Sequence, residues 1–191
     1  LNPANSIWIW GEGRKPRLES FKKLYGLDGA VISAVDLIKG IAICAGLKSI
    51  DVDGATGNIN TNFKGKADAA LDALKDGADF VYIHLEAPDE CGHRAEIENK
   101  VRSIELIDEK IVGYICDNLN KIGEEYRMLI LPDHPTPLAL RTHTRDAVPF
   151  VLYDSTSPKD NSASSYTEAN AKASGIYYDK GYKLLNVFLK K

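Results

Sequence analysis

Three of the four histidines follow short apolar segments and stand close to aspartates. Asp89 and His93 are four residues apart, Asp133 and His134 are adjacent, and His143 comes nine residues after His134. Imidazole nitrogens and carboxylate oxygens together suit Mn²⁺, Zn²⁺ or Fe²⁺ better than a thiolate site would. Five ligands exceed what one tetrahedral ion needs, and two adjacent residues would find it hard to bind one ion together. The set therefore predicts two ions a few ångströms apart, as in sites of phosphoryl transfer.

Each candidate side chain also has a structural interpretation without a metal. Asp is common at turns and helix ends, so any single member of the set could cap a helix or close a turn. Capping does not explain why histidines gather after strands, so we favour the metal site for the set as a whole. His84, inside a predicted strand, is interpreted as a structural, hydrogen-bonded histidine. Lys39, in a predicted helix, could reach a phosphate or could be an ordinary solvated lysine.

Short β-branched or aromatic segments alternate with helical patterns along the chain, and these elements must position the ligands. The predicted strands cover residues 6–10, 30–33, 50–52, 80–85, 127–131 and 148–153. The predicted helices cover residues 18–25, 35–45, 66–75, 95–119 and 182–189. The helix over residues 95–119 has the apolar stripe Ile97, Val101, Ile104, Ile111 and Ile115. Alternating strands and helices predict an α/β fold, with a mostly parallel sheet and helices on both faces.

The candidate ligands follow predicted strands, and ligands of open α/β sheets bind beyond the carboxyl ends of strands. Pro88 and Gly92 oppose a regular helix between the strand over residues 80–85 and His93, which predicts a shaped loop there. Three prolines in residues 132–137 predict a second, stiff loop that holds its side chains in place.

The composition is that of an ordinary globular chain. The 191 residues are 44% hydrophobic and 27% charged with a net charge of −3, which predicts one domain, or a substantial piece of one, and no second domain. No apolar run approaches the ~18 residues of a membrane span. No basic excess exists to neutralise nucleic-acid phosphates. Three cysteines argue against a disulfide scaffold and predict a reducing compartment such as the cytoplasm.

The order of the ligands resembles that of the alkaline phosphatase superfamily, most closely the archaeal-type branch of the cofactor-independent phosphoglycerate mutases. The motifs that carry the resemblance lie in residues 86–93, 131–137 and 141–150, with further similarity in residues 5–13 and 32–40. The resemblance extends over nearly the whole chain. It implies an alkaline-phosphatase-like three-layer sandwich truncated on its N-terminal side, with residues 1–191 as the C-terminal portion of the metal-binding domain.

The resemblance also implies the roles of individual residues. Asp89, His93 and His143 would hold one metal, and Asp133 and His134 would hold the other. The phosphate-carrying serine of the family and its first metal-binding aspartate are expected upstream, so we expect no catalytic nucleophile in this chain and no activity from it alone. We expect two divalent ions, Mn²⁺ first, with Zn²⁺, Mg²⁺ or Co²⁺ as alternatives.

The implied reaction is the glycolytic interconversion of 3-phosphoglycerate and 2-phosphoglycerate, with a small phosphorylated sugar acid as partner and Lys39 as a candidate substrate contact. A proposed homoserine kinase of the same branch is an alternative, although the sequence has no Gly-x-x-x-x-Gly-Lys-Ser/Thr loop. A metal-dependent phosphatase and a non-catalytic metal-binding module are the others. A missing half would expose apolar surface, which predicts self-association through that surface.

Overall fold

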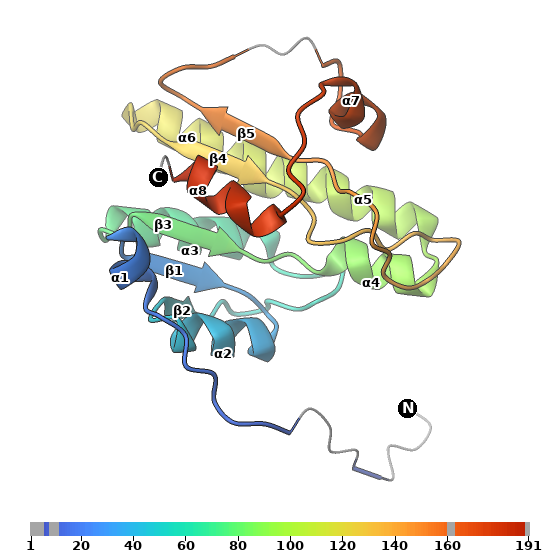
Figure 1. Ribbon diagram of the computed structural model, residues 1–191, viewed down its shortest axis with the longest axis horizontal. Coiled ribbons are helices and arrows are strands. Elements are labelled where there is room, and N and C mark those ends of the chain that lie inside the picture. Colours follow the sequence, from blue (N-terminus) through green and yellow to red (C-terminus); the bar gives the residue numbers. More distant parts are fainter. Residues whose placement is uncertain (1–5, 8–11, 160–162, 190–191) are drawn as a thin grey trace.

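The computed structural model describes residues 6–7, 12–159 and 163–189 (Figure 1). Most of the strand expected over residues 6–10 therefore lies outside the described residues. Among the helices of the described residues, none is both long and apolar enough to cross a membrane.

A parallel three-stranded sheet forms one half of the molecule. Its order is β2 (Lys48–Ile50), β1 (Gly29–Ile32) and β3 (Phe80–Ile83), and Ala30 in the middle strand faces Lys48 on one side and Val81 on the other. The last three residues of β1 are fully apolar and almost completely buried. A strand covered on both faces has this uninterrupted apolar pattern, and β1 is therefore the centre of the sheet.

A second sheet lies beyond β3 (Figure 1). Its two strands, β4 (Arg127–Ile130) and β5 (Val151–Asp154), are antiparallel. The expected α/β class is confirmed, and the parallel pairing holds for the first three strands, whereas β5 runs in the opposite direction.

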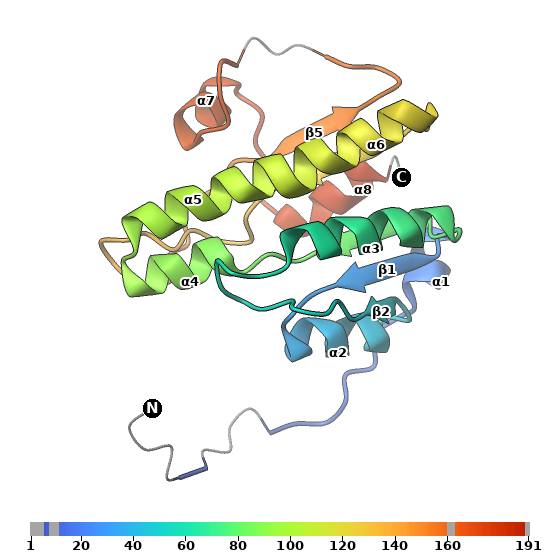
Figure 2. The ribbon, with the colours of Figure 1, turned by 180° about the vertical axis from the view of Figure 1, so that it is seen from behind.

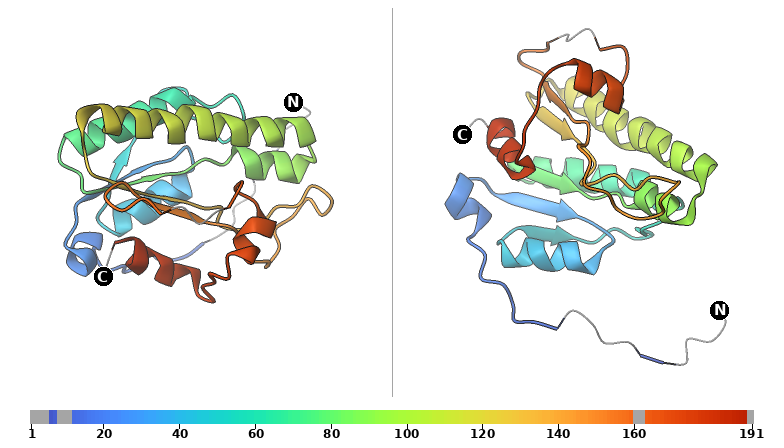
Figure 3. Two further views of the ribbon diagram at one scale, coloured as in Figure 1. Left: turned by 90° about the horizontal axis from the view of Figure 1, so that it is seen from above. Right: turned by 45° about the vertical axis from the view of Figure 1, so that its right-hand side comes forward.

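Helices cover both faces of the strands. On one face, α3 (Phe63–Lys75) packs on β1 and β3 beside a long continuous helix formed by α5 (Ile97–Ile107), a π-helical turn (Asp108–Gly113) and α6 (Tyr114–Ile122). On the opposite face lies α8 (Leu184–Phe188), as the views from behind and from above show (Figures 2 and 3). This arrangement confirms the three-layer architecture.

The remaining helices are short or lie at the periphery. Helix α2 (Asp36–Cys44) packs on β1 and β2, α1 (Phe21–Tyr25) precedes β1, and a 3₁₀ turn (Gly181–Lys183) leads into α8. Helix α7 (Glu168–Ala173) was not expected from the sequence. It is capped by Thr167, whose hydroxyl accepts a hydrogen bond from the Asn170 backbone amide.

The hydrophobic core lies between the strands and the helices of the first face. Its buried members are Ile32, Phe63, Ala67, Ala70, Ile111, Ile115 and Leu119. The expected stripe on the long helix is therefore correct only for Ile111 and Ile115. Its first three members, Ile97, Val101 and Ile104, are between 50% and 63% exposed because no described element covers that end of the helix face.

Candidate metal centre

The segment that precedes His93 is a helix, α4 (Ala87–Arg94), and the expectation of a loop is wrong. Pro88 lies in the first helical turn, where the backbone N–H that proline lacks has no partner within the helix. Gly92 serves close packing instead of breaking the helix: a Cβ there would lie 2.5 Å from the carbonyl oxygen of Thr136. Helical geometry places Asp89 and His93 on the same face, one turn apart.

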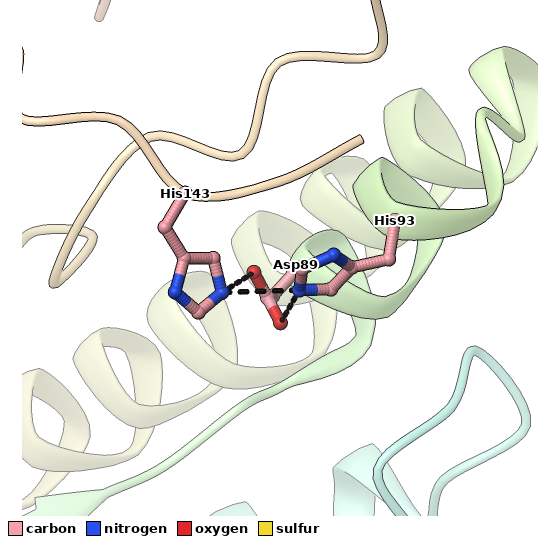
Figure 4. A group of neighbouring side chains, drawn as sticks. All are labelled: Asp89, His93 and His143. Carbon is pink, nitrogen blue, oxygen red and sulfur yellow. Dashed lines mark hydrogen bonds and ion pairs between the residues drawn. The ribbon is translucent and has the colours of Figure 1, made fainter. Parts of the chain in front are cut away.

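Helix α4 and the connection between β4 and β5 bring three ligands together (Figure 4). Nε2 of His93 lies 3.0 Å from Nε2 of His143, although the two residues are 50 positions apart in the sequence. The Asp89 carboxylate completes the triangle, with Oδ2 at 3.3 Å from His93 Nε2 and Oδ1 at 3.3 Å from His143 Nε2. Within the described residues, this is the one group of three or more such side chains that could hold an ion.

The spacing of these atoms fits a shared ion. Two ligands that each lie about 2.0–2.2 Å from a tetrahedral metal are about 3.3–3.6 Å apart. The two edges that Asp89 makes are 3.3 Å long, and the edge between the histidines is slightly shorter at 3.0 Å. Two imidazoles and one carboxylate are a donor set suited to a borderline divalent cation, and three protein ligands leave a coordination position open. Asp89 and His93 are partly buried and His143 is exposed, so an ion held here would face solvent on one side.

The tautomer of His93 is set by a backbone group. Nδ1 of His93 lies 2.9 Å from the carbonyl oxygen of Arg141, and a carbonyl can only accept, so Nδ1 carries the proton. Nε2 is then left with its lone pair directed at Asp89 and His143. Arg141 has a positive φ of 55°, which is rare for a residue with a side chain and aims this carbonyl at the histidine.

A threonine supports the carboxylate ligand. The buried hydroxyl of Thr136 donates a short hydrogen bond to Oδ1 of Asp89, and the Lys100 ammonium donates to the backbone carbonyl of Thr136 at 2.9 Å. These contacts fix the loop after β4 against α4. Hydrogen bonds of this kind orient metal ligands and are a normal part of metal sites.

Asp133 and His134 lie beside the triangle. Their Oδ2 and Nε2 atoms are 3.1 Å apart, so the two side chains meet although the residues are adjacent. The backbone makes this possible because Asp133 Oδ1 accepts from the His134 amide and turns the carboxylate back toward the ring. The His134 ring stacks on the His143 ring with centroids 3.7 Å apart, which brings the pair next to the first three ligands.

A partly buried polar cluster lies at the ends of β1 and β3. Ser33 Oγ and His84 Nδ1 are 3.1 Å apart, which confirms His84 as a hydrogen-bonded histidine, and burial lowers the pKa of its imidazole. Lys66 is 1% exposed and donates to the His84 carbonyl at 3.1 Å; burial lowers the pKa of this ammonium. Burial likewise raises the pKa of the Glu86 carboxyl.

Lys39 lies on α2 and is engaged by carboxylates. Its ammonium is 2.7 Å from Oδ1 of Asp51 and 3.9 Å from Oδ1 of Asp36. The hydrogen bond to Asp51 raises the pKa of Lys39, so the side chain is held charged near the end of β2.

Sequence reasoning missed Thr136, Lys66 and the Arg141 carbonyl. Thr136 stands between two prolines in a segment already identified, but nothing in its spacing marks its hydroxyl as the partner of Asp89. Lys66 occupies a helix position at which a lysine normally reaches solvent. A backbone carbonyl has no sequence signal at all.

Comparison with known proteins agrees with a metal centre. The model of the metalloenzyme superfamily matches residues 2–176. A probable 2,3-bisphosphoglycerate-independent phosphoglycerate mutase of Geobacter sulfurreducens is 49% identical over 99% of this chain and 47% of its own length. The 2,3-bisphosphoglycerate-independent phosphoglycerate mutase of Methanothrix thermoacetophila is also 49% identical, over 99% of this chain and 48% of its own length. The chain thus spans about half the length of the curated relatives it matches.

Solved structures agree on the fold. A protein from Pyrococcus horikoshii is 29% identical and superposes with a TM-score of 0.78, covering 90% of this chain and 50% of that one. The cofactor-independent phosphoglycerate mutase of Thermoplasma acidophilum is 22% identical with a TM-score of 0.63, covering 92% of this chain and 40% of its own. This second likeness supports the fold alone.

Proposed function

The chain belongs to the metalloenzyme superfamily, and from that premise we propose that it is the metal-binding portion of a cofactor-independent phosphoglycerate mutase. The complete protein would interconvert 3-phosphoglycerate and 2-phosphoglycerate, a step of glycolysis. The curated relatives that support this proposal carry the mutase name and are about twice as long as the chain.

One observation carries the proposal: the ligand atoms of Asp89, His93 and His143 form a triangle with sides of 3.0, 3.3 and 3.3 Å. We assign the first ion to these residues and a second ion to Asp133 and His134. Mn²⁺ is the preferred ion, with Zn²⁺, Mg²⁺ or Co²⁺ as alternatives, because the donors are oxygens and imidazole nitrogens. Such ions, when bound, neutralise phosphoryl charge and lower the pKa of an attacking hydroxyl.

The protein's own groups prepare this site. The Arg141 carbonyl holds the proton of His93 on Nδ1, and Thr136 occupies one oxygen of Asp89 with a hydrogen bond. Both contacts orient their ligands before an ion arrives, which reduces the entropy lost on binding. Lys39, already held charged by Asp51, is the candidate contact for the anionic substrate.

The nucleophilic serine and a further carboxylate ligand are assigned to the part of the complete protein that this chain does not include. The chain alone would then bind metal but not turn over substrate. The three cysteines are free thiols, which supports a reducing compartment, and we assign the mutase to the cytoplasm.

The proposal is tested by measuring metal binding on this chain and mutase activity on two proteins. Mn²⁺ binding is measured by titration calorimetry on this chain, and mutase activity with Mn²⁺ is measured on this chain and on the full-length Geobacter sulfurreducens relative. We expect metal binding here, with activity in the full-length protein alone. Metal binding without mutase activity in either protein would favour the non-catalytic module. Phosphate release from 3-phosphoglycerate by the full-length protein would favour a phosphatase.

A further inference from the structure

A large, partly open cavity with a mainly apolar lining lies between the two sheets and extends along α2 and α3, whose Ile41 and Asp68 also line it. Its volume is about 2560 Å³, and its lining includes every residue of β3 and β4. Figure 1 shows β4 as the next strand beyond β3, and both strands line this cavity. Among the described strands, β3 pairs only with β1, and β4 pairs only with β5.

The pairing registers show where the remaining backbone groups of β3 point. The amides of Phe80 and His84 donate to β1-side carbonyls, those of Asp28 and Ile32. Because residues of a parallel strand alternate between their two neighbours, the N–H and C=O groups of Val81 and Ile83 point away from β1, toward the cavity.

The same reasoning applies to β4. The Ser155 amide donates to the Tyr126 carbonyl, which makes Tyr126 and Ser155 a hydrogen-bonded pair, and Met128 and Tyr153 follow with the same alternation. The backbone groups of Arg127 and Leu129 therefore point away from β5, toward the cavity. Two strands thus present open edges to one common space.

Apolar helix side chains line both faces of this space. Ile107, Ile111, Ile115 and Leu119 line it from the α5–α6 side, and Leu184, Leu185 and Phe188 line it from α8. Backbone groups in such surroundings carry a large cost unless they are hydrogen-bonded. A segment that fills the space must supply backbone partners on two edges and apolar side chains on two faces, and a β-strand buried on both faces does this.

We infer that the cavity is the seat of one β-strand from the part of the complete protein that this chain does not include. The strand joins both edges and converts the two sheets into one. We assign it the direction of β3 and β4, which point the same way in Figure 1. It is a near-continuous run of branched apolar residues. The relatives carry about as much chain again, so the same polypeptide can deliver it.

A second copy of the chain is a poorer occupant. The edges of β3 and β4 in the second copy face the cavity of that copy. Only the outer edges of its β2 and β5 could therefore pair with this chain. Insertion of either would bring the rest of that sheet into a space that helices line on both faces.

The direction of the strand has a consequence at the metal centre. Pro88, Asp89, Asp133 and His134 line the same cavity where β3 and β4 end. The residue that follows the C-terminal end of a parallel strand would therefore lie beside these ligands. This consequence alone rests on the proposed function.

Amide hydrogen exchange at single-residue resolution tests the inference. It is measured in EDTA without substrate, so that its result does not depend on metal binding or mutase activity. In this chain we expect fast exchange at Val81, Ile83, Arg127 and Leu129, and slow exchange at the matched controls Tyr82 and Met128, whose amides bond within the existing sheets. In the full-length Geobacter sulfurreducens relative we expect slow exchange at all six equivalent amides. At the equivalents of Val81, Ile83, Arg127 and Leu129, exchange should be slower than in this chain by about 100-fold or more.

The inference is wrong if amide exchange in the full-length relative still alternates between fast and slow along β3 and β4. It is also wrong if all six amides exchange slowly in this chain alone. Sedimentation velocity at several concentrations then identifies the cause: a dimer would show that a second copy fills the cavity, and a monomer would show that the chain closes the cavity by itself.

Discussion

Nδ1 of His93 lies 2.9 Å from the carbonyl oxygen of Arg141, and this contact determines which nitrogen of the histidine is available as a ligand. Arg141, which supplies the carbonyl, has a left-handed backbone conformation with φ 55°. The contact also ties the loop after β4 to helix α4, the two elements that contribute the metal triangle.

Changing Arg141 to glycine or valine distinguishes the role of its backbone carbonyl from the role of its side chain. Glycine adopts a positive φ freely, so Arg141→Gly should keep the carbonyl in place and retain the Mn²⁺ affinity of the chain. Valine is strongly disfavoured there, so Arg141→Val should move the carbonyl and weaken Mn²⁺ binding by about 10-fold or more. Titration calorimetry measures both constants. Equal weakening in the two variants would show that the arginine side chain, and not the carbonyl, matters.

Removal of the Thr136 hydroxyl should weaken metal binding while the fold persists. Thr136→Val deletes the donor to Asp89, and loss of such a supporting hydrogen bond costs about 10–100-fold in metal affinity. Thr136→Ser keeps the hydroxyl and is the matched control, with affinity close to that of the unchanged chain. If valine and serine bind Mn²⁺ equally well, Thr136 does not position the carboxylate.

Gly92 and Gly40 form a pair that tests the close approach of α4 to the loop after β4. A Cβ at Gly92 would lie 2.5 Å from the Thr136 carbonyl oxygen, whereas a Cβ at Gly40 has nothing within 4 Å. We expect Gly92→Ala to lower the free energy of unfolding by about 1–3 kcal/mol. Gly40→Ala, within helix α2, should raise it by about 0.5–1 kcal/mol. Urea denaturation followed by circular dichroism compares them, and a neutral Gly92→Ala would contradict the packing.

The half-buried His84 predicts a pH dependence of stability. Burial lowers the pKa of His84 in the folded chain below its ordinary value of 6.5. Between these two pKa values the unfolded chain binds more protons, so the contribution of His84 is fully present above pH 6.5 and is lost as the pH falls toward the folded-state pKa. Urea denaturation in EDTA between about pH 5 and 8 should show this loss, and His84→Gln should reduce it. If the free energy of unfolding of the variant changes with pH as steeply as that of the unchanged chain, other groups cause the loss of stability.

Local pattern was sufficient to predict much of this structure. The apolar segments that became β1, β3 and β4 and the helical stretches around them are the elements that strand and helix periodicity detect best. The ligand types and their positions after strands also follow from the sequence. The sequence predicted a loop at the segment where Asp89 and His93 share one helical turn. That prediction failed because Pro88 and Gly92 count as helix breakers unless their positions in the helix and their tertiary contacts are known.

The parts that failed depend on contacts between distant segments. The connection from β4 to β5 is longer than the dozen or so residues that a crossover needs, so the sequence does not decide whether β5 is parallel. His143 joins Asp89 and His93 only because that connection folds back over α4. The exposed Ile97, Val101 and Ile104 were expected to be buried, since periodicity identifies an apolar face without saying what covers it.

Anomalous diffraction from crystals soaked with Mn²⁺ tests whether Asp89, His93 and His143 share an ion. Data collected on either side of the manganese absorption edge locate the ion without reference to any assumed ligand. We expect a peak bonded to Asp89, His93 and His143, and a second peak at Asp133 and His134 that is weaker because fewer ligands hold it. Manganese bound elsewhere, with no peak inside the Asp89, His93 and His143 triangle, would contradict this expectation.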